Sequence, residues 1–356
     1  MIAIIGGGPA GIALGLELDR RGVAYELFEA KTLAATWRAV PSGVHVLSPW
    51  WTNVLQYRQA LHGNPLRKPP AEVYLAHLEK MAGQLRGTLR TGCRVDALRA
   101  DGNGGWLLET AAGGHGSYRA VVMATGYFAT PRPAEPEIAT DGSLPMLHAA
   151  DIVDYGQLEG LRDGELPVVV VGKRVTAGQL LLELDARAIP TALSIRSGLQ
   201  YRRHGFVASI RECAYFFWEE LQARLVPNLR RASFPVMEGG ATERLVGSGK
   251  VAVLPVITAI SNGRLLLADG RQQAAAAVIL ATGYHPGLGL LPTGLEVDAY
   301  GIPKNADFQL QAMPGVHLLG FDNVYDHRSR YLRGIRADAA RLADRLALSA
   351  GDARTR

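Results

Sequence analysis

Cysteine is scarce in this sequence of 356 residues, which contains only Cys93 and Cys213. The two cysteines are far apart and form no C-x-x-C pair, so the sequence supports neither a disulfide framework, nor a zinc site, nor a dithiol redox motif. We therefore expect reduced, buried thiols and a cytoplasmic protein.

Long hydrophobic runs and long basic runs are also missing. No apolar run reaches the roughly 18 residues that a membrane-spanning helix needs, so we predict no membrane span. Lys and Arg total 38 against 33 Asp and Glu, but the cations are scattered or in pairs such as Arg202-Arg203. This pattern indicates mild attraction to anionic cofactors and no nucleic-acid partner. The partner we expect is a small-molecule substrate, and a homodimer is the alternative to a monomer.

The first thirty residues have the pattern of a dinucleotide-binding unit. An apolar run over 1–5 leads into Gly6-Gly-Gly-Pro-Ala-Gly11, an apolar-periodic segment follows to residue 18, and a second apolar run ends at Glu29. Gly6 would allow a tight turn, Gly8 a close approach of backbone to a pyrophosphate, and Gly11 close packing of helix on sheet. The free N–H groups at the helix start favour phosphate. Because this pattern begins at residue 1, we expect no signal peptide.

The pattern recurs, imperfectly, around residue 165. The apolar run 167–171 precedes Gly172-Lys-Arg-Val-Thr-Ala177, a helix expected over 178–188 and a strand over 191–195. Arg174 replaces the second glycine, so its side chain must point away or offer its own charge to a phosphate. Arg196 follows the second strand, where a cation suits the 2′-phosphate of NADP(H); a surface arginine at a strand end is the alternative.

Two Ala-Thr-Gly turns, starting at Ala124 and Ala281, indicate where the chain passes between domains. With 48% hydrophobic residues, the length suits a soluble α/β protein of two or three domains. The repeated strand–turn–helix–strand pattern and these turns predict two Rossmann-like domains, the second inserted in the first. We expect 1–150 plus 286–356 in the first domain and 151–285 in the second, with an aromatic-rich insertion near 199–250. Further helices are expected over 72–85 and 332–348, a helix ending at Leu225, and strands over 94–98, 105–109, 118–123, 251–267, 277–280 and 316–320.

These residues together resemble the flavin-containing monooxygenase branch of the flavoproteins with two dinucleotide-binding domains. The matching segments are Gly6 to Gly11, Glu29, Thr36-Trp-Arg38, Ala124-Thr-Gly-Tyr127 with Pro131, Leu147-His-Ala-Ala-Asp151, Ala281-Thr-Gly-Tyr284, Gly320 and Leu332-Arg-Gly-Ile-Arg-Ala-Asp338. The resemblance implies FAD in the first domain and NADPH in the second. It also implies that the Ala-Thr-Gly turns touch both cofactors.

The resemblance also implies which residues line the cofactors. Gly6, Gly8, Gly11, Glu29 and Trp37 should lie along FAD, Val95 beside the adenine, and Gly320 and Gly334 by the flavin ring. The remaining candidates are Pro9, Ala10, Arg38, Ser48, Ala124, Thr125, Gly126, Gly172, Arg174, Thr176, Arg196, Thr282 and Gly283. Trp51 and Asn53, in the loop with Ser48, could also contact flavin or substrate. No catalytic acid–base pair and no metal site are predicted.

Three functions follow from this reading. The first is an FAD- and NADPH-dependent monooxygenase acting on an amine or a sulfide. The second is an NAD(P)H-dependent flavoprotein reductase without oxygenation, since the family motif F-x-G-x-x-x-H-x-x-x-[FY] is only echoed, with His148 in place but Ile152 instead of an aromatic residue. The third is a flavin-binding protein with a degenerate NADPH site, which Arg174 favours.

Overall fold

The computed structural model describes residues 1–61, 64–202, 206–226, 228–230 and 236–352. Its first sheet has the strand order β19-β20-β21-β7-β1-β2-β3. The central pairings, β21–β7, β7–β1, β1–β2 and β2–β3, are parallel. The strands are β1 (Ile2–Ile5), β2 (Tyr25–Glu29), β3 (Thr88–Thr91), β7 (Ala120–Met123), β19 (Asn305–Ala306), β20 (Gln309–Leu310) and β21 (Val316–Leu318).

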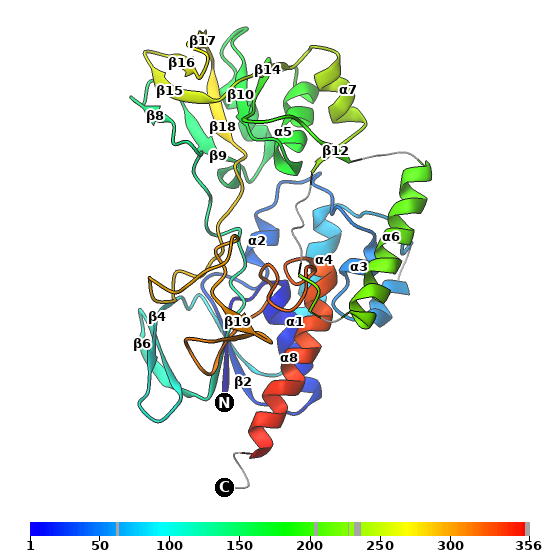
Figure 1. Ribbon diagram of the computed structural model, residues 1–356, viewed down its shortest axis with the longest axis vertical. Helices are drawn as coiled ribbons and strands as arrows, with labels where there is room; N and C mark the ends of the chain where they lie inside the picture. Colours follow the sequence, from blue (N-terminus) through cyan, green and yellow to red (C-terminus); the bar gives the residue numbers. More distant parts are fainter. Residues whose placement is uncertain (62–63, 203–205, 227, 231–235, 353–356) are drawn as a thin grey trace.

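Continuous apolar runs form the centre of this sheet. Every residue of β1 and β7 is buried, as expected for parallel strands that are covered on both faces. Helix α1 (Pro9–Arg20) packs against α4 (Ala71–Ala82) and α8 (Leu332–Asp352). An antiparallel meander of β4 (Val95–Ala100), β5 (Trp106–Thr110) and β6 (Gly113–Tyr118) completes the layers (Figure 1).

A second, parallel sheet repeats this plan in the upper part of Figure 1, with the order β14-β11-β10-β18-β9. Helix α5 (Val175–Ala186) follows β10 and packs on α7 (Ala241–Gly247). The strands are β9 (Met146–His148), β10 (Val168–Val171), β11 (Thr191–Ser194), β14 (Ala252–Leu254) and β18 (Ala277–Leu280). A small sheet of β8 (Ala139–Thr140), β15 (Ile257–Ser261), β16 (Arg264–Leu267) and β17 (Gln272–Ala274) lies on it. The fold is therefore two Rossmann-like units, as the sequence predicted.

Short elements complete the chain. They are α2 (Ala35–Arg38), α3 (Trp50–Asn53), η1 (Tyr57–Leu61), η2 (Ala149–Asp151), η3 (Tyr155–Leu161), β12 (Tyr201–Arg202) and β13 (Met237–Glu238). Among the described helices, none is long and apolar enough to cross a membrane.

Several element boundaries differ from the prediction. Helix α5 begins at Val175 rather than residue 178, because Arg174 is already its N-cap. Helix α4 ends at Ala82, three residues before the predicted end. The Gly-rich strand β6 was not predicted, since glycine carries no hydrophobic pattern.

Two segments lie in other places than expected. Strands β8 and β9 pair within the second unit, so we infer that the chain enters it before residue 139 rather than at 151. Helix α6 (Phe206–Leu225), from the insertion expected in the second domain, lies on the side of α3 instead (Figure 1). Its Glu219 pairs with Arg333 at the start of α8. Part of that insertion, 203–205, 227 and 231–235, falls outside the described residues.

Candidate cofactor sites and the link between the two units

The fold itself requires glycine at two positions of the first turn. Gly6 has a φ of +112°, and a Cβ there would lie 2.5 Å from the carbonyl oxygen of Ala124. A Cβ at Gly11 would lie 1.9 Å from the oxygen of Gly6. Both distances are impossible contacts, so these glycines let turn, helix and β7 come together.

Gly8 is different, because the protein does not require its glycine. Its φ is −83°, and a Cβ would meet nothing within 4 Å. As the N-cap of α1 it has no side chain to bond the free N–H groups of the first turn, and Pro9 follows it. The turn therefore leaves open space at a helix N-terminus, which fits a pyrophosphate.

Glu29 ends β2 beside this turn. Its carboxylate accepts hydrogen bonds from the backbone N–H groups of Gly7 (2.7 Å) and Lys31 (2.8 Å). The N–H of Cys93 donates to the Glu29 carbonyl at 2.9 Å, which brings the start of β4, with buried Val95, to the same edge. The turn, the acidic residue and Val95 are thus neighbours, as an adenosine site requires.

Asp322 is a candidate that the sequence reading missed. It follows β21 by four residues, is only 6% exposed, and accepts hydrogen bonds from the Tyr127 hydroxyl (2.6 Å) and from Arg330 (3.2 Å). Burial and the Asp322 charge raise the pKa of Tyr127 well above its usual range. The signal was available, since Gly320-Phe-Asp322 places an acid after a strand end, as Glu29 does. A Cβ at Gly320 would lie 3.1 Å from that of Ala10, so this loop borders α1.

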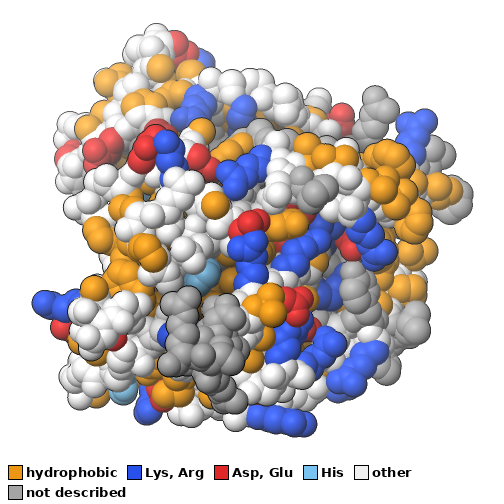
Figure 2. All heavy atoms as spheres, turned by 60° about the horizontal axis from the view of Figure 1, so that its bottom comes forward, with side chains coloured by type: hydrophobic (Ala, Val, Ile, Leu, Met, Phe, Trp, Pro, Cys, Tyr) orange, Lys and Arg blue, Asp and Glu red, His pale blue; other side chains and the backbone are white. Residues whose placement is uncertain are grey.

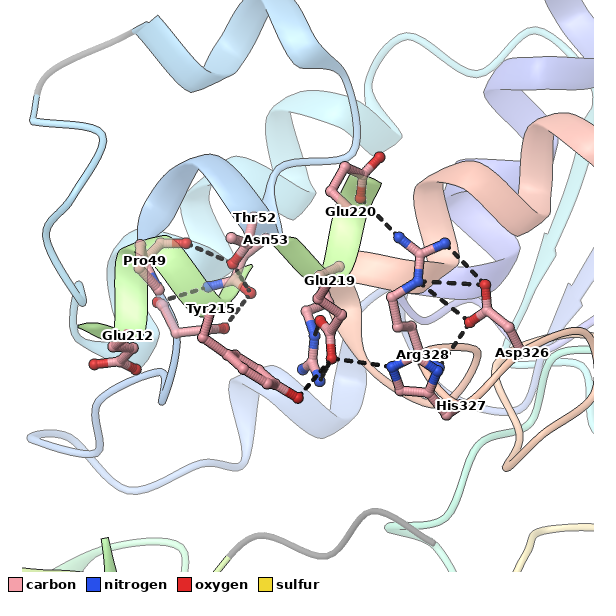
Figure 3. Close-up of polar contacts among 12 residues, drawn as sticks. Pro49, Thr52, Asn53, Glu212, Tyr215, Glu219, Glu220, Asp326, His327 and Arg328 are labelled. Atoms are coloured by element: carbon pink, nitrogen blue, oxygen red, sulfur yellow. Dashed lines mark hydrogen bonds and ion pairs between the residues drawn. The ribbon is translucent and has the colours of Figure 1, made fainter. Parts of the chain in front are cut away.

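The segment 37–53, between β2 and α4, is held in place by contacts within it and with α4. The Trp37 and Tyr74 rings are 4.5 Å apart between centroids, and Arg38 pairs with Glu79 at 2.6 Å. Ser48 donates to the Asn53 side-chain oxygen at 2.7 Å, and the Asn53 amide donates back to the Ser48 carbonyl at 3.0 Å. Figure 3 shows Asn53 bonded in this way beside Pro49 and Thr52. Ser48 and Asn53 thus bind each other.

Gly334 has a packing reason of its own. A Cβ there would lie 2.2 Å from the Arg328 carbonyl oxygen. The glycine therefore allows the first turn of α8 to contact the loop before it.

The second turn repeats the geometry of the first at its start and departs from it later. Gly172 has a φ of +151°, and a Cβ there would lie 2.5 Å from the Ala281 oxygen, as Gly6 does from Ala124. Ala177, buried in α5, takes the position of Gly11. Thr176 lies in the first turn of α5. The duplication therefore extends to the contact between each turn and its Ala-Thr-Gly segment.

Arginines from both units act electrostatically on Arg174 in this second turn. Partial burial lowers the pKa of the Arg174 guanidinium, and the positive charges of Arg330, Arg132 and Arg196 lower it further. Arg196 is 61% exposed along its side chain and lies 3.2 Å from the carbonyl oxygen and 3.9 Å from the carboxylate of Glu135. Such a collection of like charges fits a polyanionic ligand.

The Ala-Thr-Gly turns are bonded to the opposite crossing. Thr125 donates its hydroxyl to the Gly287 carbonyl at 2.5 Å, and Thr282 donates to the Arg132 carbonyl at 2.5 Å. Gly126 and Gly283 both have positive φ. Backbone hydrogen bonds between 126–132 and 283–287 join the same segments. The two crossings thus run side by side from one unit to the other.

Two further kinds of site, a metal centre and a separate cavity, come into question in the part of the chain that the structure describes. No cluster of three or more His, Cys, Asp or Glu among the described residues could hold a metal ion. A cavity of about 280 Å³ lined by Leu295, Lys304 and Gln311 lies at the β19–β20 edge, away from both turns.

Residues 3–204, more than half of the chain, match the model of a family described as pyridine nucleotide-disulphide oxidoreductase. The chain belongs to this family. As a member, it is an FAD-dependent oxidoreductase with two nucleotide-binding units, which agrees with the two turns and the paired crossings.

Relatives of this oxidoreductase include monooxygenases and a reductase. It is 24% identical over 359 residues to the probable indole-3-pyruvate monooxygenase YUCCA3 of Arabidopsis thaliana, covering 85% of this chain and 77% of that protein. Its structure is similar to the flavin-containing monooxygenase of Stenotrophomonas maltophilia, with a TM-score of 0.75, 20% identity and 98% of both chains covered. It is also similar to the bacillithiol disulfide reductase of Staphylococcus aureus, with a TM-score of 0.70, 15% identity and 98% of both chains covered.

Proposed function

We propose that this oxidoreductase is a flavoprotein monooxygenase that uses FAD and NADPH and oxygenates a small nitrogen- or sulfur-containing substrate. The observation that carries the proposal is the pair of equivalent turns, after β1 and after β10, joined by bonded crossings. This arrangement suits two nucleotide cofactors that must meet between the units. The names of the plant and Stenotrophomonas relatives support the oxygenation step.

The first unit has what FAD needs. Open space at Gly8 faces the N-terminus of α1, Glu29 ends the next strand, and buried Asp322 lies behind Gly320. Bound FAD would supply hydride acceptance and reaction with dioxygen, which no side chain can provide. The protein would bind and orient the cofactor at these groups and keep water out of the site.

The second unit has charges that suit NADPH. Arg174 at the start of α5 would pair with the pyrophosphate, and Arg196, beyond β11, with the 2′-phosphate. Arg196 would leave Glu135 on binding, which its exposure permits.

Oxygen labelling tests the reaction. Purified protein is mixed with NADPH and ¹⁸O₂ and a panel of amines, sulfides and indole-3-pyruvate, the last taken from the plant relative's name. A monooxygenase transfers one labelled atom to product as NADPH is consumed. NADPH oxidation that yields only hydrogen peroxide, or that needs an added disulfide, would support the reductase instead. No NADPH oxidation would support a flavin-binding protein with a degenerate second site.

The NADPH preference is tested at Arg196. Arg196→Ala should raise the Michaelis constant for NADPH about ten- to a hundredfold, the value of a charge-assisted contact, and leave that for NADH nearly unchanged. Arg271→Ala is the matched control, since Arg271 is also exposed and paired with a neighbouring carboxylate, at 2.7 Å. Equal losses with both cofactors would give Arg196 a structural role.

A further inference from the structure

Helix α6 turns its acidic side chains toward the rest of the protein, and each is paired there with a cation. Figure 3 shows the contacts of Glu219 and Glu220. The pairs are Glu212 with Lys68 at 3.0 Å, Glu219 with Arg333 at 2.5 Å and Glu220 with Arg328 at 2.7 Å. The Glu219 side chain is 1% exposed and that of Arg328 is 2% exposed. These ion pairs, together with the buried side chains of Phe216 and Ala223, hold this helix against the first unit.

The opposite side of α6 is apolar and exposed. We call it the α6 apolar face and define it as Ile210, Phe217, Trp218, Leu221, Leu225 and Val226. Phe217, Trp218 and Leu225 are 68%, 57% and 67% exposed. Spacings of three, four and seven place these residues on one side of the helix. An amphipathic surface helix normally buries its apolar stripe, so this orientation is reversed and indicates a binding surface.

Two arginines of the helix accompany the α6 apolar face, and one of them, Arg224, lies 3.8 Å from the carboxylate of Glu220. Arg211 is exposed, and Arg224 has 69% of its side chain exposed. Arg230, shortly after the helix, is also exposed. Figure 2 shows hydrophobic side chains gathered at the right side of the molecule, the side where α6 lies, with Lys and Arg next to them. The surface thus combines large apolar side chains with positive charge.

We propose that the α6 apolar face binds the surface of an anionic lipid bilayer. Phe, Trp and Leu are the side chains that enter the boundary between headgroups and acyl chains, and arginines beside them bind lipid phosphates. A second copy of the chain fits less well. Two α6 helices packed antiparallel about Phe217 and Trp218 would bring Arg211 of each copy near Arg224 of the other, and like charges oppose that contact.

Vesicle sedimentation of the purified full-length protein with its flavin tests the proposal. We expect binding to vesicles of phosphatidylglycerol and phosphatidylcholine, and much weaker binding to phosphatidylcholine alone. Exchanging Phe217→Ser together with Leu221→Ser should weaken binding by about tenfold or more, since each side chain buries apolar area on insertion. Leu348→Ser is the matched control, because Leu348 is a 74% exposed leucine on helix α8. Absence of wild-type binding to anionic vesicles would overturn the proposal. So would equal binding by the double variant and the Leu348→Ser control.

A second measurement does not depend on a disruptive variant. Lipids brominated along their acyl chains should quench tryptophan fluorescence of the wild type, and Trp218→Phe should still bind while losing most of that quenching. Undiminished quenching in Trp218→Phe would show that another surface meets the lipid. Sedimentation equilibrium tests whether a second copy of the chain binds the α6 apolar face. If the wild type is a dimer and the double variant Phe217→Ser with Leu221→Ser is a monomer, the face is a dimer interface and the lipid proposal is wrong.

Discussion

At the scale of single residues, the glycines of the first turn have different steric constraints. Gly6 and Gly11 are required by the protein's own backbone, whereas Gly8 faces open space. Substitutions at these positions should therefore separate folding from cofactor binding.

Gly8→Val should give folded protein that has lost its flavin. A Cβ at Gly8 meets no protein atom within 4 Å, and the branched side chain would lie where the pyrophosphate is expected. The ratio of flavin to protein absorbance and the thermal unfolding curve measure the two effects. Gly11→Val should instead prevent folding, since its Cβ would overlap the Gly6 carbonyl oxygen. Full flavin occupancy in Gly8→Val would show that this turn does not hold the cofactor.

Arg174→Gly should weaken NADPH binding, most strongly at low salt. Burial lowers the pKa of Arg174, and repulsion by Arg330, Arg132 and Arg196 lowers it further; an anionic cofactor would relieve that repulsion. Anaerobic titration at two salt concentrations measures the effect. Arg174→Lys, which keeps the charge, should retain the salt dependence. Tighter binding and faster flavin reduction in the glycine variant would mean that the arginine blocks the site.

At the scale of elements, buried charged groups help to hold helices α6 and α8 in place. Burial alone would raise the pKa of Glu219, but hydrogen bonds from His327 and Arg333 hold it at about 2. Burial and the charge of Asp326 raise the pKa of Asp338, in α8, to about 7. The surroundings therefore stabilise the charged form of Glu219 and disfavour the charged form of Asp338.

Glu219→Gln should destabilise the protein by about 3 kcal/mol at neutral pH, because Arg333 would lose its countercharge in a largely buried place. Since the folded pKa of Glu219 lies below its ordinary value of 4.5, this stabilisation is present above pH 4.5 and is lost as pH falls toward about 2. Urea unfolding measures it. The control Glu109→Gln breaks an exposed pair with Arg99 and should cost less than about 1 kcal/mol. If both substitutions lower the free energy of unfolding by the same small amount, the ion pair of Glu219 does not stabilise the position of α6.

Asp338→Asn should stabilise the protein by about 2–4 kcal/mol near pH 8. The folded state binds the Asp338 proton more tightly than the unfolded state does, so ionisation costs stability as pH rises from 3.8 through about 7. The gain over wild type should vanish near pH 4, where the carboxyl is protonated in the folded state. Asp344→Asn, on the same helix with a 66% exposed side chain, is the control and should show no such gain. A gain independent of pH would contradict this explanation.

The bonded crossings set how the two units sit together at the scale of the whole molecule. Units within a chain normally move relative to each other unless the interface between them is large and hydrophobic. Here Thr125 and Thr282 each bind a carbonyl on the opposite crossing.

The double variant Thr125→Val with Thr282→Val should keep its flavin but slow flavin reduction by NADPH. Each lost hydrogen bond is worth about 0.5–1.5 kcal/mol, so placement of the units should loosen without unfolding either. Anaerobic stopped-flow reduction measures the rate. Thr258→Val is the control, because Thr258 makes the same type of bond, at 3.1 Å to the Leu266 carbonyl, within one unit. An unchanged reduction rate would show that other contacts position the units.

The sequence by itself determined the parts of this protein that depend on near neighbours along the chain. Strand β1, the turn from Gly6 to Gly11, helix α1 and Glu29 lie within thirty residues, so hydrophobic period and glycine spacing were enough to predict them. The same holds for β10 and the Gly172 turn, and for both Ala-Thr-Gly segments. Composition indicated an α/β protein of two or three domains, and the repeated pattern predicted the two Rossmann-like units.

Only the tertiary structure decided which distant residues meet. Arg330 lies by Arg174, and Asp322 by Tyr127, because loops from separate parts of the chain converge at strand ends, and neither pair has a sequence spacing that predicts it. Helix α6 was misplaced for the same reason. Its hydrophobic pattern indicates an apolar side but not which side faces the protein. Three ion pairs with residues far away in sequence, together with the burial of Phe216 under Arg333, leave the larger apolar side outward.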